Sequence, residues 1–420
     1  EDSDTERNPC RLALTLRIED DAADLDFTGS DPQLTSSINV PTGGSPHHTL
    51  MLVGVYYILY TLNPNILLNI GLTRPFKCIL PKGTVVNPEY PAAVGMRSLT
   101  CGRLRSLIFG AFGLAMPERM PAAPAGSSSI VNVMTTDNKS GKRVIAAIDP
   151  VVGGAGGMPH ADGPDGSGAD ASYLKNTPVE LIEAEVPIEI VRYGLAPDSG
   201  GAGENRGGLG TWLEFKVFSP GTRITARNRD RTRFQPWGIL GGKAGRPSNF
   251  IRNPDTPKEE VLGNQDTLTA EPGDVIRFYG PGGGGRGNPL DRVAGRVLRD
   301  VERGALSLQA AQADYGVVIA EGAVDESATV ALRDKMRAGQ NGDAHFDFGP
   351  EREDYERRWT PEAYNAMSAI MESLPVHWRF FVKARIFDAM NASEAGGADV
   401  VQDAFRRIAA EHPQIGAAAE

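Results

Sequence analysis

The stretch that decides the fold reads Gly280-Pro281-Gly282-Gly283-Gly284-Gly285-Arg286-Gly287-Asn288-Pro289. Glycine occupies six of its first eight positions. The run cannot form the interior of a helix or a strand, because glycine loses more backbone entropy on folding than any other residue. It is typical of backbone that needs positive φ or lies close against a neighbour. We expect a strand over residues 274–279 before the run and a helix over 290–316, broken at Gly304, after it.

Part of the run matches the dinucleotide-binding pattern G-x-G-x-x-G, with glycines at positions 280, 282 and 285. Pro281 lies inside this pattern and Pro289 interrupts the helix that should follow, so we expect neither NAD nor FAD here. The N–H groups of Gly283 and Gly284 could still cradle an anionic group of a substrate. The alternative is close backbone packing that shapes a cavity or a subunit contact beside the arginine-rich segment upstream.

That upstream segment covers residues 222–234. If it forms a strand, side chains at every second position share one face. Five arginines then lie together, namely Arg223, Arg227, Arg229, Arg231 and Arg233. Like charges on one face repel each other unless they meet carboxylates or phosphates. We therefore predict that Arg227, Arg229 and Arg231 contact an anion, either a phosphorylated intermediate or a partner subunit. The alternative is pairing inside the chain with the acidic residues Glu180, Glu183, Glu185 and Glu189.

A second candidate segment, residues 149–172, is rich in glycine and aspartate and has too little side-chain volume to build a core. Long loops of this kind are usually either functional or disordered. His160 lies in this segment, with Asp162 and Asp165 close to it in sequence. A histidine and a carboxylate can transfer protons or bind a metal ion. We predict that His160 and Asp162 are catalytic, and we assign no metal, because the H-x-D spacing alone does not specify one.

The rest of the chain alternates between strand and helix patterns, read from apolar residues with a period of two or of 3.6 residues. Strands are expected over residues 11–18, 23–27, 76–80, 84–86, 130–134, 143–148, 178–193 and 211–217, and buried helices over 46–62 and 99–116. Helical patterns then dominate, over 327–338, 361–373, 375–391 and 398–411. We expect an α+β protein, with a mixed, strand-rich core that holds buried helices over residues 1–320 and a mainly helical C-terminal region over 321–420.

Composition excludes several classes of protein. The 420 residues carry a net charge of −10, which disfavours nucleic acid as a partner. The three cysteines have neither metal-ligand nor disulfide spacing, so we expect a reducing, cytoplasmic location. The sequence contains no uninterrupted run of about 18 apolar residues, so we predict no transmembrane helix. The chain starts with Glu1 rather than Met, so we expect a processed chain or a fragment of a longer one.

Short motifs follow one another in a recognisable order along residues 11–319. They are Asp26-Phe27-Thr28-Gly29-Ser30, Ile38-Asn39-Val40-Pro41, Asn69-Ile70-Gly71, Arg74-Pro75, Pro81-Lys82-Gly83-Thr84-Val85-Val86-Asn87-Pro88, Pro91-Ala92-Ala93-Val94, Asp198-Ser199-Gly200-Gly201-Ala202-Gly203, Arg206-Gly207-Gly208-Leu209-Gly210, the glycine run with Asn288-Pro289, and Tyr315-Gly316-Val317-Val318. This ordered set resembles the hydantoinase B family. The family comprises the B half of 5-oxoprolinases and N-methylhydantoinases and the matching subunits of acetone and acetophenone carboxylases.

The resemblance implies an obligate hetero-oligomeric, ATP-dependent enzyme that does not use biotin. A hydantoinase A-like partner subunit would bind ATP and Mg²⁺ and phosphorylate the carbonyl or enol oxygen of a small-molecule substrate. The B-type subunit would host the second step, which is ring hydrolysis in the lactamases and attack on activated CO₂ in the carboxylases. Arginine side chains and glycine N–H groups would then stabilise the developing oxyanions.

This chain departs from the family pattern at both ends. Family members usually carry a further N-terminal part that can supply metal ligands. We therefore expect a partner chain or segment that carries this part, and any Zn²⁺ or Mn²⁺ would bind outside the present segment. The tail after Val318 is longer than in simple hydantoinase B chains, and such extensions are more typical of carboxylase-type subunits.

We therefore predict a subunit of an ATP-dependent, biotin-independent ketone carboxylase of the acetone or acetophenone type. One alternative is a subunit of an ATP-dependent cyclic-amide hydrolase of the 5-oxoprolinase or N-methylhydantoinase type. A non-catalytic scaffold that holds the ATPase subunit is the other alternative.

Overall fold

The computed structural model describes residues 8–415 except 127, 168–175, 228–230, 264–266, 341 and 343. The mixture of helices and sheets confirms the expected α+β class. The chain forms two compact units, which we call the sandwich unit, Met116–Gly349, and the split unit, Glu1–Ala115 together with Pro350–Glu420. This division differs from the expected boundary after residue 320, because the last helices pack with the N-terminal segments.

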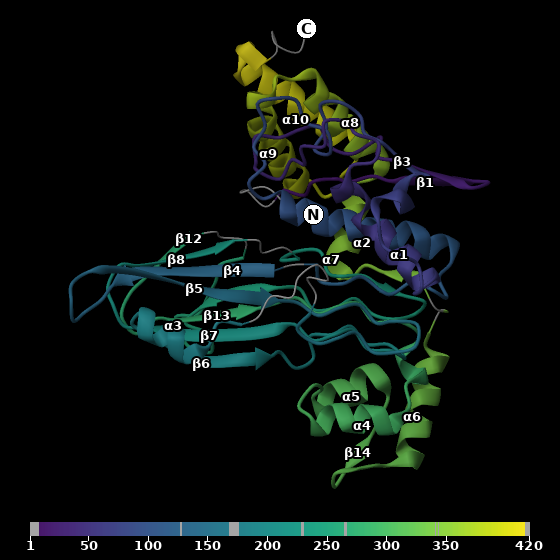
Figure 1. Cartoon of the computed structure of the whole chain (residues 1–420), viewed down its shortest axis with the longest axis vertical. Helices are drawn as coiled ribbons and strands as arrows, with labels where there is room; N and C mark the ends of the chain where they lie inside the picture. The colour runs from purple at the N-terminus through teal and green to yellow at the C-terminus, as the bar shows by residue number, and fades with distance from the viewer. Residues whose placement is uncertain are drawn as a thin grey trace. The chain divides into compact units, whose positions relative to one another are not determined.

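The sandwich unit contains two antiparallel sheets that lie one above the other (Figure 1). One sheet has the strand order β12-β8-β4-β5, and the other has the order β11-β10-β13-β7-β6. The strands of the first sheet are β4 (Ser128–Thr136), β5 (Arg143–Val152), β8 (Thr222–Arg227) and β12 (Thr267–Ala270). Those of the second are β6 (Ile188–Leu195), β7 (Thr211–Val217), β10 (Asn249–Arg252), β11 (Glu260–Val261) and β13 (Val275–Tyr279).

Side chains from both sheets form one hydrophobic core. In β7, Leu213, Phe215 and Val217 are fully buried, whereas the residues between them are only half-buried. The rings of Phe250 and Phe278 stack with their centroids 4.2 Å apart. Alternation of this kind is what a strand with one face in a core requires, and it explains why the expected strand over 211–217 is confirmed.

Several strand predictions are wrong in part. Of the strand expected over 222–234, the structure describes Thr222–Arg227 as β8, and Arg231, with φ of 56°, does not belong to a strand. The segment 178–193 begins as a short helix, α3 (Val179–Glu185), before β6. Residues 84–86 form no strand, although Thr84 makes isolated bridges.

Four short helices follow the glycine run in the sandwich unit. They are η2 (Pro289–Asp291), α4 (Ala294–Glu302), α5 (Leu308–Tyr315) and α6 (Glu326–Ala338). The expected break at Gly304 is confirmed, with φ of 69°. Ser307 begins α5 as its N-cap, because its hydroxyl accepts the N–H of Ala310. The remaining strands pair in twos, β14 (Ile319–Ala320) with β15 (Ala323–Val324) and β9 (Gly238–Ile239) with β16 (Phe346–Asp347).

The glycine run packs against other backbone segments so closely that no side chain fits between them. A Cβ atom on Gly283 would lie 1.9 Å from the carbonyl oxygen of Ala155, and one on Gly284 would lie 1.9 Å from that of Trp237. A Cβ atom on Gly207, in a facing segment, would lie 2.0 Å from the carbonyl oxygen of Gly283. Glycine is therefore required on more than one side of these contacts, and we call this arrangement the glycine array.

Backbone hydrogen bonds join the segments of the glycine array. The N–H of Gly283 donates to the carbonyl of Gly208 at 2.9 Å, and the N–H of Gly284 donates to that of Ala123 at 2.8 Å. The carbonyl of Gly284 in turn accepts the N–H of Gly157 at 2.8 Å. Buried backbone groups need such partners, so the array satisfies its polar groups without forming a regular sheet.

The split unit combines a small sheet with helices from both ends of the chain. Its sheet has the order β1 (Thr15–Glu19), β2 (Ala22–Asp26) and β3 (Phe76–Ile79), with β2 and β3 parallel. Its helices are α1 (Thr49–Leu62), η1 (Ile70–Thr73), α2 (Arg97–Ala115), α7 (Pro350–Arg358), α8 (Pro361–Ser373), α9 (Val376–Ala392) and α10 (Ala398–Glu411). No helix among the described residues is long and apolar enough to cross a membrane.

A buried ion pair ties the C-terminal helices to the N-terminal part of the split unit. The Lys383 ammonium in α9 lies 3.3 Å from a carboxylate oxygen of Asp31, and their side chains are 1% and 3% exposed. Tyr364 in α8 donates its hydroxyl to the same oxygen at 3.1 Å. Burial and the charge of Asp31 raise the pKa of Tyr364 well above its ordinary value, so the hydroxyl keeps its proton.

The close contacts of the glycine array predict a specific cost for any side chain there. We expect Gly283→Ala to destabilise the sandwich unit by about 3 kcal/mol, because the added methyl group forces backbone apart. Gly295→Ala is the matched control, since nothing lies within 4 Å of the position of its Cβ atom. The control should stabilise α4 by up to about 1 kcal/mol, because alanine has the higher helix propensity.

The change in unfolding free energy of both variants is measured by urea denaturation, with hydrogen exchange of peptides from β7 and β13 as the readout. Equal unfolding midpoints for Gly283→Ala and the unsubstituted protein would contradict the close packing described above.

Candidate functional site

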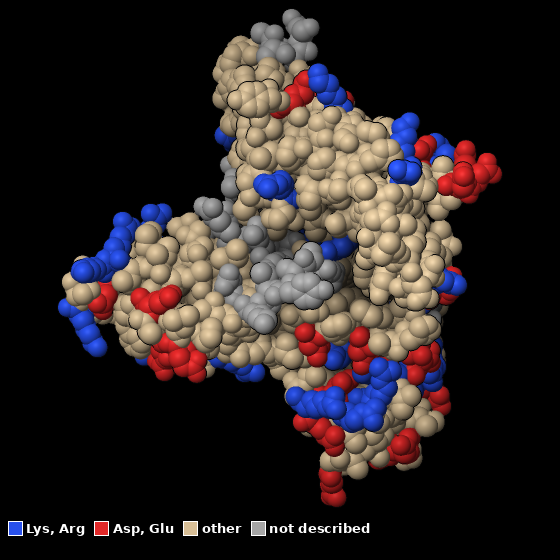
Figure 2. Space-filling model, in the orientation of Figure 1, with Lys and Arg blue, Asp and Glu red and all other residues tan. Residues whose placement is uncertain are grey.

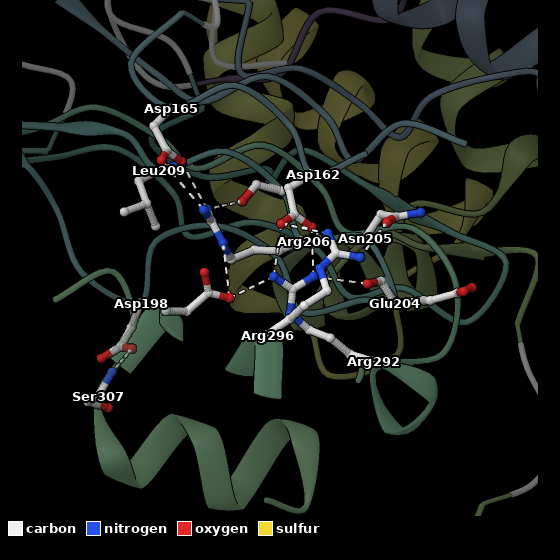
Figure 3. A network of polar contacts seen from close by, with 12 residues as sticks. Asp162, Asp165, Asp198, Glu204, Asn205, Arg206, Leu209, Arg292, Arg296 and Ser307 are labelled. Atoms are coloured by element: carbon white, nitrogen blue, oxygen red, sulfur yellow. Dashed lines mark hydrogen bonds and ion pairs between the residues drawn. The ribbon is translucent and has the colours of Figure 1, made fainter. Parts of the chain in front are cut away.

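The candidate site lies in the sandwich unit, where charged residues from three segments meet (Figure 3). We call this cluster the arginine–aspartate network. The loop after β5 contributes two aspartates, the glycine-rich loop before β7 contributes one arginine, and the segment from η2 through α4 contributes the rest. Its members are Asp162, Asp165, Arg206, Arg292, Arg296 and Asp300.

The glycine array fixes the loop after β5. The N–H of Gly154 donates to the carbonyl of Pro281 at 2.9 Å, and the N–H of Gly163 donates to that of Arg206 at 2.8 Å. A Cβ atom on Gly163 would lie 2.1 Å from the carbonyl oxygen of Ala155. These contacts leave little freedom on either side of His160, which is exposed.

Asp162 lies at the centre of the network. Its two carboxylate oxygens accept the two terminal N–H groups of Arg292 at 2.7 and 2.8 Å. The guanidinium of Arg296 lies 2.9 Å from one of these oxygens, and the backbone N–H of Arg206 donates to the other at 2.8 Å. The fork of Arg292 thus binds the carboxylate in the bidentate geometry that gives the strongest ion pairs.

A second set of contacts extends the network in the same alternating pattern. Arg206 donates to Asp165 at 2.9 Å, and the backbone N–H of Leu209 donates to the same oxygen at 2.8 Å. Arg292 also donates to Asp300 at 2.7 Å, and Arg206 lies 3.8 Å from Asp300. Each arginine therefore faces at least one carboxylate.

Burial and charge set the protonation states of the network. Burial alone would raise the pKa of Asp162, but hydrogen bonds and the charge of Arg292 lower its pKa below the ordinary value. Burial likewise opposes the charge of Arg292, which is 1% exposed, yet Asp162 and Asp300 raise its pKa. Both groups of this pair are therefore charged at neutral pH, and the contacts hold the loop, the segment before β7 and α4 together.

The two predicted catalytic residues differ in their exposure and in their contacts. His160 is exposed, whereas the carboxylate of Asp162 is occupied by two guanidinium groups and a backbone N–H. An ionised carboxylate held this way stabilises the loop and is poorly suited to accept a proton. The catalytic roles of His160 and Asp162 stay predictions, and the contacts of Asp162 favour a positioning role for its carboxylate.

One member of the predicted arginine face, Arg231, does not lie in a strand. Arg231 has φ of 56°, which no strand residue adopts, and its guanidinium donates to the carbonyl of Gln235 at 3.3 Å. The expectation that Arg231 continues the strand is therefore wrong. The side chain of Arg227 and all of Arg229 lie outside the described residues, so their contact with an anion stays a prediction, as does the alternative of internal pairing.

The predicted ligand contacts in the glycine run, Gly283 and Gly284, direct their N–H groups to backbone carbonyls. These N–H groups are therefore not available to a phosphate, which favours the close-packing interpretation. Within the part of the chain that the structure describes, no three His, Cys, Asp or Glu side chains gather to hold a metal ion. The described residues thus do not form a Zn²⁺ or Mn²⁺ site, and the expectation that such an ion binds outside this segment stays a prediction.

Residues of the network that the sequence did not single out are Arg292, Arg296 and Asp300. They follow one another at intervals of four. Arg296 and Asp300 lie on one face of α4, whereas Arg292 precedes the helix with extended backbone. This spacing is a usable signal, but it does not reveal that the face meets a loop about 130 residues earlier.

Removal of the central charge tests the network. Asp162→Asn leaves the buried Arg292 with one carboxylate partner, Asp300, so we expect a loss of about 2 kcal/mol of unfolding free energy at pH 7. Because the folded-state pKa of Asp162 lies below its unfolded value of about 3.9, this contribution is present above about pH 4 and is lost as pH falls further. Glu302→Gln, an exposed change of equal charge, is the control.

Urea titrations at pH 7, 5, 4 and 3 measure the difference between the unsubstituted protein and Asp162→Asn. The difference should be constant from pH 7 to 5 and shrink below pH 4. A difference that is the same at pH 7 and pH 3 would show that the carboxylate charge does not stabilise the loop.

Comparison with known proteins places these features in context. A family model described as hydantoinase B/oxoprolinase matches residues 2–289. The beta subunit of caprolactamase from Pseudomonas jessenii is 33% identical over 343 residues, which cover 77% of this chain and 56% of that subunit. The chain spans about half the length of the curated relatives it matches.

Two solved structures share the fold. The crystal structure of ATP-dependent caprolactamase from Pseudomonas jessenii matches with a TM-score of 0.64 and 30% identity, over 77% of this chain and 56% of that one. A nucleotide-free structure of acetone carboxylase matches with a TM-score of 0.67 over 93% of this chain and 57% of that one, and at 19% identity it shows the fold alone. The family model covers more than half of the chain, so this protein belongs to the hydantoinase B/oxoprolinase family.

Proposed function

We propose that the chain is part of a B-type subunit of an ATP-dependent enzyme that acts at the carbonyl carbon of a small molecule. Family membership supports this proposal, as does the description of both solved relatives as ATP-dependent. ATP and Mg²⁺ would bind to a hydantoinase A-like partner subunit, and the activated substrate would then react on the B-type subunit. Biotin has no part in the proposed reaction.

Carboxylation of a ketone is the first reaction that we propose. The observation that carries it is the extent of the shared fold, since acetone carboxylase matches 93% of this chain and caprolactamase matches 77%. Because the match to acetone carboxylase covers 93% of this chain, it must include C-terminal helices of the chain. These helices belong to the extension that is typical of carboxylase-type subunits.

Hydrolysis of a cyclic amide is the second candidate reaction, favoured by a different observation. The chain is 33% identical to the beta subunit of caprolactamase, against 19% identical to the acetone carboxylase chain. Both reactions begin with ATP-dependent activation of a carbonyl group. They differ in the second reactant, which is bicarbonate-derived CO₂ in one and water in the other.

Within this chain, we propose that His160 transfers the proton of the second step. The imidazole is exposed on a loop that the glycine array and the arginine–aspartate network hold in place. Histidine can take up or release a proton near neutral pH, and a positioned general acid or base contributes about 10²–10⁴-fold to a rate. Asp162 acts indirectly, by fixing the loop.

The two reactions are separated by an assay of the complete complex that contains this chain. We expect ATP turnover that requires both bicarbonate and a ketone such as acetone or acetophenone, with a carboxylated product. ATP turnover with ε-caprolactam or 5-oxoproline in the absence of bicarbonate would overturn the carboxylase proposal and establish the hydrolase. Turnover with neither set of substrates would contradict both.

Substitution of the proposed proton-transfer residue gives a second test. We expect His160→Ala to lower kcat of the intact complex about 10²–10⁴-fold with little change in KM. His377→Ala is the control, because His377 is an exposed histidine in α9. A kcat within about twofold of the unsubstituted complex for His160→Ala would favour the scaffold alternative for this chain.

A further inference from the structure

The split unit contains a long stretch without charge. Residues 49–73 include no Asp, Glu, Lys, Arg or His, and they form α1, a connecting turn and η1. One side of α1 is buried, through Met51, Leu52 and Val55 among others. Its backbone approaches α2 closely, since a Cβ atom on Gly54 would lie 3.1 Å from the side chain of Ile108.

The opposite side of this stretch is apolar and exposed. Val53, Tyr57 and Tyr60 follow one another at intervals of four and three residues, which places them on one stripe of the helix. The exposed stripe continues into the segment after α1. We call this surface the apolar face, and its members are Val53, Tyr57, Tyr60, Leu67, Leu68 and Ile70.

Exposure of this kind is unusual for a helix. A helix that is hydrophobic on all sides is normally buried, and contiguous exposed apolar surface marks an interaction site. Tyr60 is 49% exposed and Leu67 is 80% exposed. Figure 2 shows a broad uncharged surface over α1, whereas the surface over α4 to α6 carries charges of both signs.

The composition of the apolar face fits a protein and not a lipid surface. Interfacial membrane helices carry Lys and Arg on their polar side, and residues 49–73 contain neither. The α1 helix has 14 residues, and a helix needs about 20 to span a bilayer. Tyrosine is enriched and charge is depleted in the core of protein interfaces, as they are here.

We propose that the apolar face binds the remaining part of a hydantoinase B-type subunit, whether that part lies on the same polypeptide or on another. This chain covers only 52–56% of the length of these curated relatives. Each relative therefore contains nearly as many residues outside the matched region as inside it. A surface that is covered within one subunit resembles a domain core more than a transient contact. The proposal rests on family membership and is independent of which reaction the enzyme catalyses.

Site-specific photo-cross-linking in the complete complex tests the occupant directly. Tyr60→p-benzoylphenylalanine should cross-link to peptides of the B-type subunit that lie outside the 420 residues of this chain, identified by mass spectrometry. Ile145→p-benzoylphenylalanine is the control, because Ile145 is 62% exposed but lies on β5 of the sandwich unit. The readout needs no turnover, so failure of the proposed reaction leaves it intact.

Three outcomes would overturn the proposal. They are cross-links from position 60 only to a second copy of these 420 residues, cross-links only to lipid or to no polypeptide, and cross-links to the same peptides from position 145 in equal yield. The first would identify the apolar face as a contact between copies of this chain. The second would leave it without a protein occupant.

A charge placed on the apolar face provides an independent measurement. If the two parts are separate polypeptides, Tyr60→Asp should weaken their association at least about tenfold. If they share one polypeptide, Tyr60→Asp should raise the rate of limited proteolysis at the junction between the two parts by a similar factor. Tyr60→Phe should change neither value more than about twofold. Tyr60 is half exposed, so far-UV circular dichroism should be unchanged in both variants. Equal association of Tyr60→Asp and Tyr60→Phe would overturn the proposal.

Discussion

Close backbone packing is the constraint on which the sandwich unit depends. Where the glycine run meets its neighbours, carbonyl oxygens occupy the positions that Cβ atoms would need. Backbone hydrogen bonds connect the run to segments near residues 123, 157 and 208. They provide partners for N–H and C=O groups that would otherwise be buried without a hydrogen bond. Because these contacts are made by backbone and not by side chains, their geometry is unusually insensitive to side-chain motion. The loops that emerge from the array are therefore held at both ends.

The charged network makes use of this rigidity. Ion pairs that are taken out of water are favourable only when their geometry is good and their remaining hydrogen-bonding groups are satisfied. The two terminal nitrogens of Arg292 meet this condition through two carboxylates and a backbone carbonyl, that of Glu204 at 3.0 Å, whereas its buried Nε has no hydrogen-bond partner. The network consequently connects the loop of His160 to α4 without leaving a net charge unpaired in the interior. Its role is to fix the loop that carries the candidate chemistry.

Local patterns predicted much of the fold. The alternation in β7 and the helical spacing in α8 and α10 gave the observed bounds, because each element buries one face. The strands β10, β11 and β12 were missed, since they are short and carry few apolar residues. Helix α7 was missed because nearly all of its residues are polar.

The candidate site was predictable only in part. Glycine-rich composition located the loops, and the motif pattern located the family. Whether glycine N–H groups face a ligand or a carbonyl depends on segments that are distant in sequence, as the contact of Gly283 with Gly208 shows. The same holds for Asp162, whose role follows from Arg292, 130 residues later. The left-handed backbone of Arg231 has no sequence signal, because arginine rarely adopts it.

The ion pair between Asp31 and Lys383 has a consequence for the order in which the protein forms. These residues are 352 positions apart, and the whole sandwich unit is made between them on the ribosome. Domains fold as units during synthesis, N-terminal ones first, when their residues are contiguous. Here the contiguous sandwich unit can complete its core while residues 1–115 of this sequence still lack α8 and α9. During synthesis, Asp31 therefore lacks its partner Lys383 until α9 has been made, and the segment around Asp31 reaches its final environment only after the sandwich unit has been synthesised.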